Sequence, residues 1–345
     1  MSILKIKIWY LAFLERDKKN IFELLLYWLL YIISVIYGLV VRVRNFFYDR
    51  NILPSFSCNS KVISVGNISW SGSGKTPLSI WLYSQISPFF KTAVLRRGYG
   101  DDENKLLKEK INNVFYDPNR YKLAKSLESE FKVFIVDDGF QHRKFRRDIN
   151  IVVMGAREFK RKFRLIPAYI FREPLTSLIR ADIVILNYAD ELDNTDKIKN
   201  QLLRINPSLK IYCSKYRVEK FMDLKGNKVD KEYLMTKKLA AFAAIGYPQG
   251  FFNKLKSSGI IIEQYIVYPD HFELSEKEFD GLQQSLIDNG IRDLIITHKD
   301  KYHIPERNIK LNIYIMEIDI EIESSKVLMR EIKNKLSKCI LSPNI

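Results

Sequence analysis

The hydrophobic pattern of the first fifty residues differs from that of the rest of the chain. Residues 24–41 form a run of 18 positions without a charge. As a helix this run would extend about 27 Å, just enough to cross a bilayer. Basic residues flank it on both sides, so a single crossing would carry one basic flank across the membrane, against the positive-inside tendency. We therefore expect a helix that lies in, or dips into, the cytoplasmic leaflet, with a buried core helix as the alternative.

After residue 60, short apolar runs alternate with helical patterns of apolar positions. The runs that predict buried strands are residues 61–66, 92–95, 133–136, 150–154, 182–186, 239–245, 260–267, 293–297 and 311–318. The segments that predict helices are residues 75–87, 119–129, 248–258, 275–289 and 325–337. This alternation is typical of an α/β fold in which helices cover both faces of a mostly parallel sheet.

Length and a polar stretch near residue 190 suggest a division into segments. A chain of 345 residues is long enough for about two domains. We expect a membrane-associated helical segment over residues 1–50, a core domain over 51–190 and a smaller second α/β lobe over 191–345.

Composition and charge narrow the classes of protein. Apolar residues make up 47% of the chain, which excludes wholesale disorder. Three cysteines without metal-ligand spacing exclude a disulfide framework and a structural zinc site. The net charge of +16 suits nucleic acid, an anionic membrane or a phosphorylated substrate. Because the Lys and Arg residues are scattered and form no basic helix or zinc finger, we do not expect nucleic acid as a partner.

The most informative motif is a Ser/Gly-rich loop between the first predicted strand and the helix after it. It runs through Ser69, Trp70, Ser71, Gly72, Ser73, Gly74, Lys75 and Thr76. Such a loop points backbone N–H groups and the positive end of a helix dipole at one place, where a nucleotide phosphate binds. We expect this loop to hold ATP, with Lys75 at the β- and γ-phosphates and Thr76 offering its hydroxyl to Mg²⁺. Ser69 stands where the usual phosphate-loop pattern has glycine.

Two adjacent carboxylates follow the predicted strand 133–136. They are Asp137 and Asp138, and in phosphate-loop enzymes an aspartate at such a strand end holds Mg²⁺ directly or through water. Neighbouring side chains on a strand point to opposite faces, so the two aspartates should have different roles. The alternative is that Asp-Asp-Gly is a turn signal.

Taken together, these motifs resemble the tetraacyldisaccharide 4′-kinases, which phosphorylate a membrane-embedded glycolipid in lipid A synthesis. The resemblance covers most of the chain. The matching stretches are residues 65–67, 97–99, 137–143 (Asp-Asp-Gly-Phe-Gln-His-Arg), 172–175 (Arg-Glu-Pro-Leu), 180–182, 268–271 (Tyr-Pro-Asp-His) and 297–300. In this family a missing first glycine in the phosphate loop is usual, so Ser69 fits the resemblance.

The resemblance implies a reaction, a substrate and further site residues. It implies transfer of the γ-phosphate of ATP to the 4′-hydroxyl of tetraacyldisaccharide 1-phosphate, giving lipid IVA, at the cytoplasmic face of the inner membrane. It also implies an aspartate–histidine pair, for which Asp102 and His271 are the counterparts, with Asp101 as the fallback for the aspartate. Glu173 is implied as a helper that holds the metal or its water. Asn104 replaces the proline of the family's Gly-Asp-Glu-Pro element, and the segment before that element is almost absent. His142, His298 and His303 receive no catalytic role.

A membrane-tethered nucleotide switch is the alternative function. A GTPase needs Asn/Thr-Lys-x-Asp to read guanine, and the two nearest sequences, residues 187–190 and 297–300, lack lysine in second place. A partitioning-type ATPase has a lysine where this chain has Trp70. Both differences favour the kinase.

Overall fold

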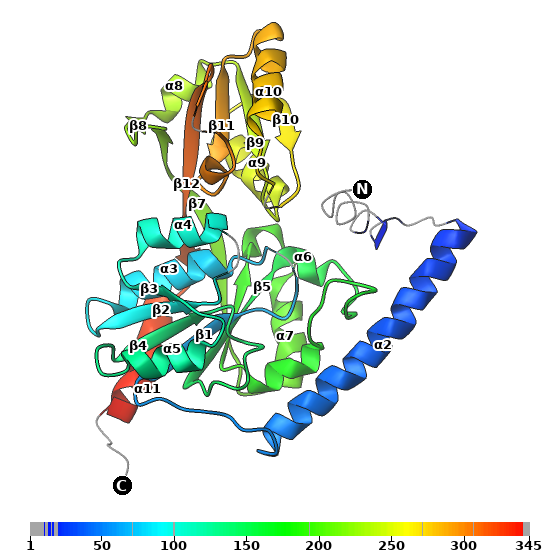
Figure 1. Ribbon diagram of the computed structural model, residues 1–345, viewed down its shortest axis with the longest axis vertical. Coiled ribbons are helices and arrows are strands. Elements are labelled where there is room, and N and C mark those ends of the chain that lie inside the picture. The colour runs from blue at the N-terminus through cyan, green and yellow to red at the C-terminus, as the bar shows by residue number, and fades with distance from the viewer. Residues whose placement is uncertain are drawn as a thin grey trace. The chain divides into compact units, whose positions relative to one another are not determined.

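The computed structural model describes residues 10, 13–14, 16, 20–70, 72–98, 101–192, 194–270, 272–305 and 307–340. They form two compact units (Figure 1). Unit 1 contains Met1–Gly98, Ile111–Lys215 and Glu321–Ile345, and unit 2 contains Tyr99–Lys110 and Tyr216–Ile320. The chain therefore passes from unit 1 to unit 2 and back more than once.

Unit 1 is built on a parallel sheet whose strand order is β7-β6-β5-β1-β4-β2-β3. The strands are β1 (Lys61–Gly66), β2 (Thr92–Arg96), β3 (Val114–Tyr116), β4 (Val133–Asp137), β5 (Ile149–Gly155), β6 (Ile183–Asn187) and β7 (Lys210–Asp223). Its central strands are buried along almost their whole length. Because β1 pairs with both β4 and β5, the carboxyl ends of these three strands meet at one edge of the sheet.

Helices of unit 1 bury their apolar sides against this sheet. They are α3 (Lys75–Ile86), α5 (Arg120–Leu127), α6 (Ala156–Phe159), α7 (Thr195–Ile205) and α11 (Ser325–Ile340), with short 3₁₀ turns η1 (Leu175–Arg180) and η2 (Ala189–Glu191). Leu202 of α7 packs with Val152 and Met154 of β5. Ala124 of α5 packs with residues of β2 and β4. The helices thus fix the ends of the strands that carry the candidate site.

Helix α2 (Ile21–Asp49) lies along unit 1 with one narrow side buried (Figure 1). Asn20 and Glu23 form a capping box that starts it. Ser34 donates a hydrogen bond of 2.8 Å to the carbonyl of Leu165, and a Cβ on Gly38 would lie 2.8 Å from the Leu165 side chain. The close approach suits glycine, because a Cβ at this position would require the Leu165 side chain to shift.

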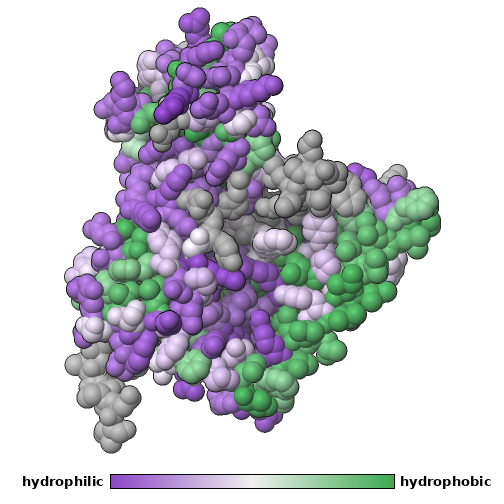
Figure 2. All heavy atoms as spheres, in the orientation of Figure 1, coloured by the Kyte–Doolittle hydropathy of each residue, from purple (hydrophilic) through white to green (hydrophobic). Residues whose placement is uncertain are grey.

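The remaining surface of α2 is apolar and open. Figure 2 shows it as a continuous hydrophobic stripe along the helix. The large residues with exposed fractions of 54% to 78% are Ile21, Phe22, Leu25, Trp28, Leu29, Ile32, Ile36, Leu39 and Val40. Among the described residues, this is the helix long and apolar enough to cross a membrane. A fully buried core helix, the alternative considered from the sequence, does not fit this exposure.

Unit 2 is a smaller parallel sheet with the order β10-β9-β11-β12. Its strands are β9 (Leu239–Ala243), β10 (Ile262–Val267), β11 (Asp293–Thr297) and β12 (Asn312–Ile322), and β8 (Lys228–Val229) pairs antiparallel with the end of β7. Its helices are α4 (Asp101–Lys110), α8 (Lys231–Met235), α9 (Pro248–Ser257), α10 (Glu276–Asp288) and the 3₁₀ turn η3 (Asp300–Tyr302). Alternate residues of β9 contribute to two separate cores, one under α10 and one under α9, as a sheet covered on both faces requires.

The predicted α/β fold is confirmed, whereas the expected boundary after residue 190 differs from the division observed. The first residues of β7 pair in parallel with β6 from Lys210 to Ser214, so this stretch and α7 belong to unit 1. Residues 99–110, which come between strands of unit 1, belong to unit 2. The local hydrophobic pattern could not assign these two segments to their units, because the assignment depends on the surface that each segment packs against.

Candidate active site

The loop between β1 and α3 is held by amide side chains. Gly74 caps α3 with a φ of 92°, a conformation that favours glycine because it has no Cβ. The Asn67 side chain donates a 2.9 Å bond to the Ser73 hydroxyl, and Asn187, at the end of β6, donates a 2.8 Å bond to the Ser73 carbonyl. Two strand ends therefore fix the backbone that leads into the helix. Ser71 lies outside the described residues.

The first part of the loop is tied to a neighbouring segment. The Ser69 hydroxyl donates a 2.6 Å bond to the buried Glu158 carboxylate, and the Trp70 N–H donates a 2.7 Å bond to the carbonyl of Ile170. Trp70 itself is 67% exposed, and Gly72 is exposed as well. Ser69, which the usual motif would replace by glycine, therefore has a structural role as an anchor of the loop.

Lys75 and Asp138 face each other beside the start of α3. The Lys75 Nζ lies 3.8 Å from Asp138 Oδ1, and the guanidinium of Arg172 makes two bonds of 3.1 and 3.2 Å to the same carboxylate. Burial alone would raise the pKa of Asp138, but Lys75 and Arg172 outweigh it and hold that pKa well below its usual range. This group of charges lies where the sequence places nucleotide phosphate.

Asp137, the last residue of β4, has other partners. It is 1% exposed, accepts a 2.9 Å bond from the Ser79 hydroxyl and pairs with Arg96 at 2.8 Å. The Arg96 guanidinium also lies 3.5 Å from the Thr76 hydroxyl. The structure thus brings Thr76 and Asp137 together through Arg96, a residue that the sequence analysis missed and that only its place at the end of β2 could have suggested.

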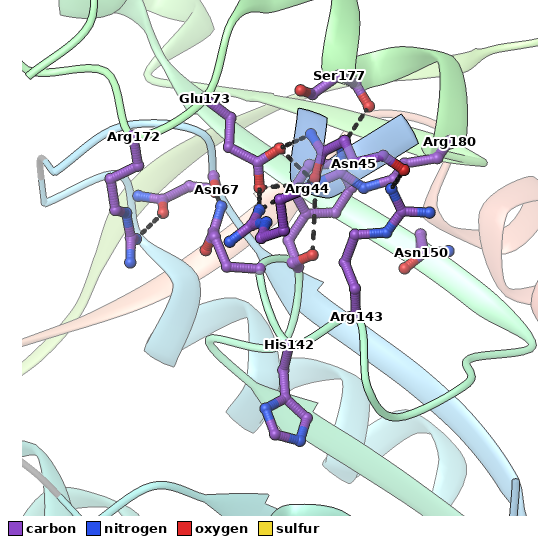
Figure 3. Close-up of polar contacts among 12 residues, drawn as sticks. Arg44, Asn45, Asn67, His142, Arg143, Asn150, Arg172, Glu173, Ser177 and Arg180 are labelled. Carbon is purple, nitrogen blue, oxygen red and sulfur yellow. Dashed lines mark hydrogen bonds and ion pairs between the residues drawn. The ribbon is translucent and has the colours of Figure 1, made fainter. Parts of the chain in front are cut away.

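The fourth proposed metal residue, Glu173, is not brought to Thr76 or Asp137 by any described contact. Figure 3 shows its carboxylate among Arg44, Asn45 and Arg180. Arg180 bonds to both of its oxygens at 2.8 Å, and the Asn45 amide of α2 donates a 3.0 Å bond. Glu173 is 1% exposed, so its observed contacts fasten α2 to the segment that carries Arg172.

Among the described residues, no group of three or more His, Cys, Asp or Glu is arranged to hold a metal ion. This is compatible with Mg²⁺, because Mg²⁺ is usually held by one or two carboxylates together with substrate phosphates and water. Thr76, Asp137 and Asp138 meet that requirement at the end of β4 and the start of α3. The three oxygen donors are hard ligands of the kind that Mg²⁺ prefers.

Unit 2 contains a second group of buried charges around Asp102 of α4. Asp102 is 4% exposed and its Oδ2 lies 3.0 Å from Lys299 Nζ and 3.1 Å from His303 Nε2. Lys299 also pairs with Asp270 at 3.1 Å. Burial alone would lower the pKa of Lys299, but the negative charges of the neighbouring carboxylates outweigh it, so the pKa is raised. Asp101, the fallback for the catalytic aspartate, is the first residue of α4, and its side chain lies outside the described part of the chain.

The expected partner of Asp102, His271, lies outside the described residues. The histidine that the described structure places against Asp102 is His303, which the sequence analysis left without a role. The two residues are 201 positions apart in the chain, and no local signal in the sequence connects them. Asp270 does lie with Lys299, so the Tyr-Pro-Asp-His stretch reaches this group of charges through its aspartate.

The two units supply different chemistry. Unit 1 offers a helix N-terminus and Lys75 and Arg172, which suit a polyphosphate. Unit 2 offers Asp102, a buried carboxylate oriented by two nitrogen donors, which suits acceptance of a proton.

Comparison with known proteins covers both units. A family model described as Tetraacyldisaccharide-1-P 4'-kinase matches residues 26–337. A Tetraacyldisaccharide 4'-kinase from Elusimicrobium minutum is 30% identical over 90% of this chain and 91% of its own. One from Halothermothrix orenii is 25% identical over 96% and 98%. A crystal structure of the "apo" form of LpxK from Aquifex aeolicus in complex with ATP superposes with a TM-score of 0.67, at 25% identity, over 88% of this chain and 97% of that one.

Proposed function

The chain belongs to the tetraacyldisaccharide-1-P 4'-kinase family, and we propose how its own residues carry out that reaction. It is a lipid A 4′-kinase, which uses ATP to phosphorylate the 4′-hydroxyl of tetraacyldisaccharide 1-phosphate and so forms lipid IVA. The observation that carries this conclusion is the family match across residues 26–337, together with strand β1 and a helix α3 that begins at Gly74 and Lys75.

ATP is the phosphoryl donor, and we place its phosphates against the loop that ends at Gly74. The N–H groups at the start of α3 and the Lys75 ammonium neutralise the charge of the β- and γ-phosphates. Arg172, which now pairs with Asp138, is positioned to share that charge. Since phosphoryl transfer depends mainly on positioning and charge neutralisation, these residues account for the donor half of the reaction.

Mg²⁺ is proposed as the metal, held by the Thr76 hydroxyl and by Asp137 and Asp138. Held by these residues, the ion would supply neutralisation of the negative charge on the phosphates. Asp137 now accepts bonds from Ser79 and Arg96, so its part is supported by its place at the end of β4 rather than by an open coordination position. Glu173 contributes to this site indirectly, by fixing the segment next to Arg172.

Asp102 is proposed to accept the proton of the 4′-hydroxyl as the γ-phosphoryl group moves to that oxygen. Lys299 and His303, at 3.0 and 3.1 Å, orient this buried carboxylate. By its motif, His271 is the proposed family partner of Asp102.

Helix α2 is proposed to hold the kinase on the cytoplasmic leaflet of the inner membrane. The exposed apolar side chains of α2 suit insertion among acyl chains, and the net charge of +16 suits an anionic surface. The acceptor is a glycolipid, so an enzyme anchored in this way meets its substrate in the plane of the membrane.

The decisive experiment locates the phosphate. The purified full chain is incubated with γ-labelled ATP and the disaccharide 1-phosphate in detergent micelles, and the position of the new phosphate is read by mass spectrometry. We expect a single product phosphorylated at the 4′ position, formed only with the acceptor present. Label released as inorganic phosphate without product would instead identify an NTPase.

A further inference from the structure

His303 is the most completely buried histidine of the described chain, and both of its ring nitrogens meet carboxylates. Nε2 lies 3.1 Å from Asp102 Oδ2 and Nδ1 lies 3.2 Å from Asp300 Oδ1. The three side chains are 1%, 4% and 0% exposed, respectively. No solvent is therefore in a position to satisfy these atoms in place of their partners.

The geometry determines the protonation state of this ring. An ionised carboxylate only accepts hydrogen bonds, and a neutral imidazole carries one N–H, so it can satisfy only one of the two carboxylates. A neutral ring would set a nitrogen lone pair against the other carboxylate. Both contacts are favourable only for the imidazolium, and although burial lowers the pKa of His303, its bonds to Asp102 and Asp300 raise that pKa to about 9.

Asp300 fixes the far side of the ring. One of its oxygens accepts a 2.9 Å bond from the Ala244 N–H just after β9, and the other accepts a 2.7 Å bond from the Thr297 hydroxyl at the end of β11. The chain of contacts from Asp102 through His303 to Asp300 thus ends on the backbone of the unit 2 sheet. These contacts connect Asp102, in the first turn of helix α4, to the sheet of unit 2.

From this arrangement we infer that His303 is a positioning residue for Asp102, holding its carboxylate in the orientation in which it accepts the proton of the acceptor hydroxyl. The inference rests on the proposed role of Asp102. In the step, the hydroxyl oxygen forms a bond to the γ-phosphorus, the bond from that phosphorus to the bridging oxygen of ADP breaks, and the hydroxyl proton passes to Asp102. His303 keeps its own proton throughout.

Other charged groups lie around Asp102. Glu103 from α4 and Asp270 from the loop after β10 both face Lys299, and Asp300 faces the ring itself. The pKa of Lys299 is raised above its usual value, and that of His303 is raised to about 9. A decline of activity near pH 9 that disappears when His303 is replaced therefore reports on His303.

The test is His303→Gln, which keeps one hydrogen bond but cannot carry the charge. We expect kcat to fall by roughly tenfold to a hundredfold, the loss typical of a misplaced catalytic group, with the KM for ATP changed by less than about twofold. The wild-type enzyme should lose kcat as pH rises through about 9, and the variant should lack that decline. A purely structural role would leave the decline in place.

His298→Gln is the matched control. His298 also meets two carboxylates, Glu109 at 3.2 Å and Glu317 at 2.7 Å, but makes no described contact with Asp102. This variant should keep both the wild-type kcat and the decline near pH 9. An equal loss in the two variants would mean that any histidine of this unit matters in the same way, and would overturn the inference.

Asp102→Asn separates this inference from the proposed function. If Asp102→Asn is inactive while His303→Gln behaves as wild type, the inference is wrong and the proposed base stands. If Asp102→Asn is active, the proposed base is wrong and the inference fails with it. Should His303→Gln not fold, ¹⁵N-histidine NMR of the wild-type chain, which has four histidines, decides the matter. A neutral His303 ring at pH 7.5 contradicts the inference and an imidazolium supports it.

Discussion

The buried carboxylate of Glu173 provides the sharpest prediction about unit 1. Glu173→Gln keeps the size of the side chain but removes the charge that Arg180 meets at 2.8 Å through both oxygens. Arg180 is 12% exposed, and its guanidinium lies 3.8 Å above the Phe140 ring, so it cannot turn to solvent without unpacking. Breaking a buried pair by removing one partner costs about 3–5 kcal/mol. For a unit of this size, that lowers the Tm by roughly 6 °C or more.

The measurement is thermal unfolding of the full chain in detergent micelles, for Glu173→Gln and for a surface control. Glu130→Gln is the matched control, because Glu130 pairs with Lys91 at 3.1 Å while both side chains are about half exposed. Such a pair contributes about 0–1 kcal/mol, so the control should unfold close to the wild-type Tm. The KM for ATP of Glu173→Gln, measured below its Tm, should stay near wild type.

The pH dependence gives a second readout of the same contact. Burial would raise the pKa of Glu173, but Arg180 and the Asn45 amide outweigh it, so the folded pKa lies below its usual value. The charge therefore stabilises the fold above the ordinary glutamate pKa of about 4.3, and this contribution is lost as pH falls through the lower folded value. The gap in Tm between wild type and Glu173→Gln should narrow in that acid range. An unchanged Tm with a large loss of Mg²⁺–ATP affinity would refute this reasoning and place Glu173 at the metal.

Three further predictions address other parts of the molecule. Lys75→Ala should abolish transfer, because the transition state loses about 3–4 kcal/mol of stabilisation, while the Tm is retained. Near-wild-type turnover would contradict the proposed phosphate site. Removing residues 1–50 should move the chain from the membrane to the soluble fraction in sedimentation and raise the KM for the lipid more than that for ATP. In unit 2, the His298 bond and Lys110 lower the pKa of Glu317 to about 2; Glu317→Gln should therefore remove stability that wild type keeps above pH 4.5 and loses as pH falls toward 2, as seen by acid unfolding.

The sequence predicted the buried strands well because each is a nearly continuous apolar run. Residues 61–66 and 293–297 match β1 and β11 residue for residue. Strand β3 was missed because it has only three residues, and β7 because its buried positions are scattered along 14 residues. Helix α7 was not predicted, and its first residues were assigned to the polar stretch near residue 190. A single residue of this helix, Leu202, is buried, so its apolar periodicity is weak. Short or weakly buried elements lack the periodicity on which the prediction depends.

The candidate site also contains features that the sequence could predict and features that it could not. The phosphate loop is made by backbone N–H groups at a helix start, so its signal is local and survives the change of glycine to Ser69. Asp137 and Asp138 are equally local, and the structure gives them different partners, Arg96 for one and Lys75 with Arg172 for the other; strand β4 ends at Asp137, and Asp138 follows it with a φ of 51°.

Groups built from side chains that meet across the chain leave no such signal. Arg172 and Glu173 are neighbours in one motif, yet Arg172 turns to Asp138 and Glu173 to Arg180, so a shared motif did not mean a shared ligand. Asp102 and His303 are in contact although no local sequence motif connects them. A buried carboxylate must find a cation wherever the fold brings one, and the identity of that cation is decided by tertiary packing. In this chain the partners of Asp102 are Lys299 and His303, and the second of them has its pKa raised to about 9 by the carboxylates it meets.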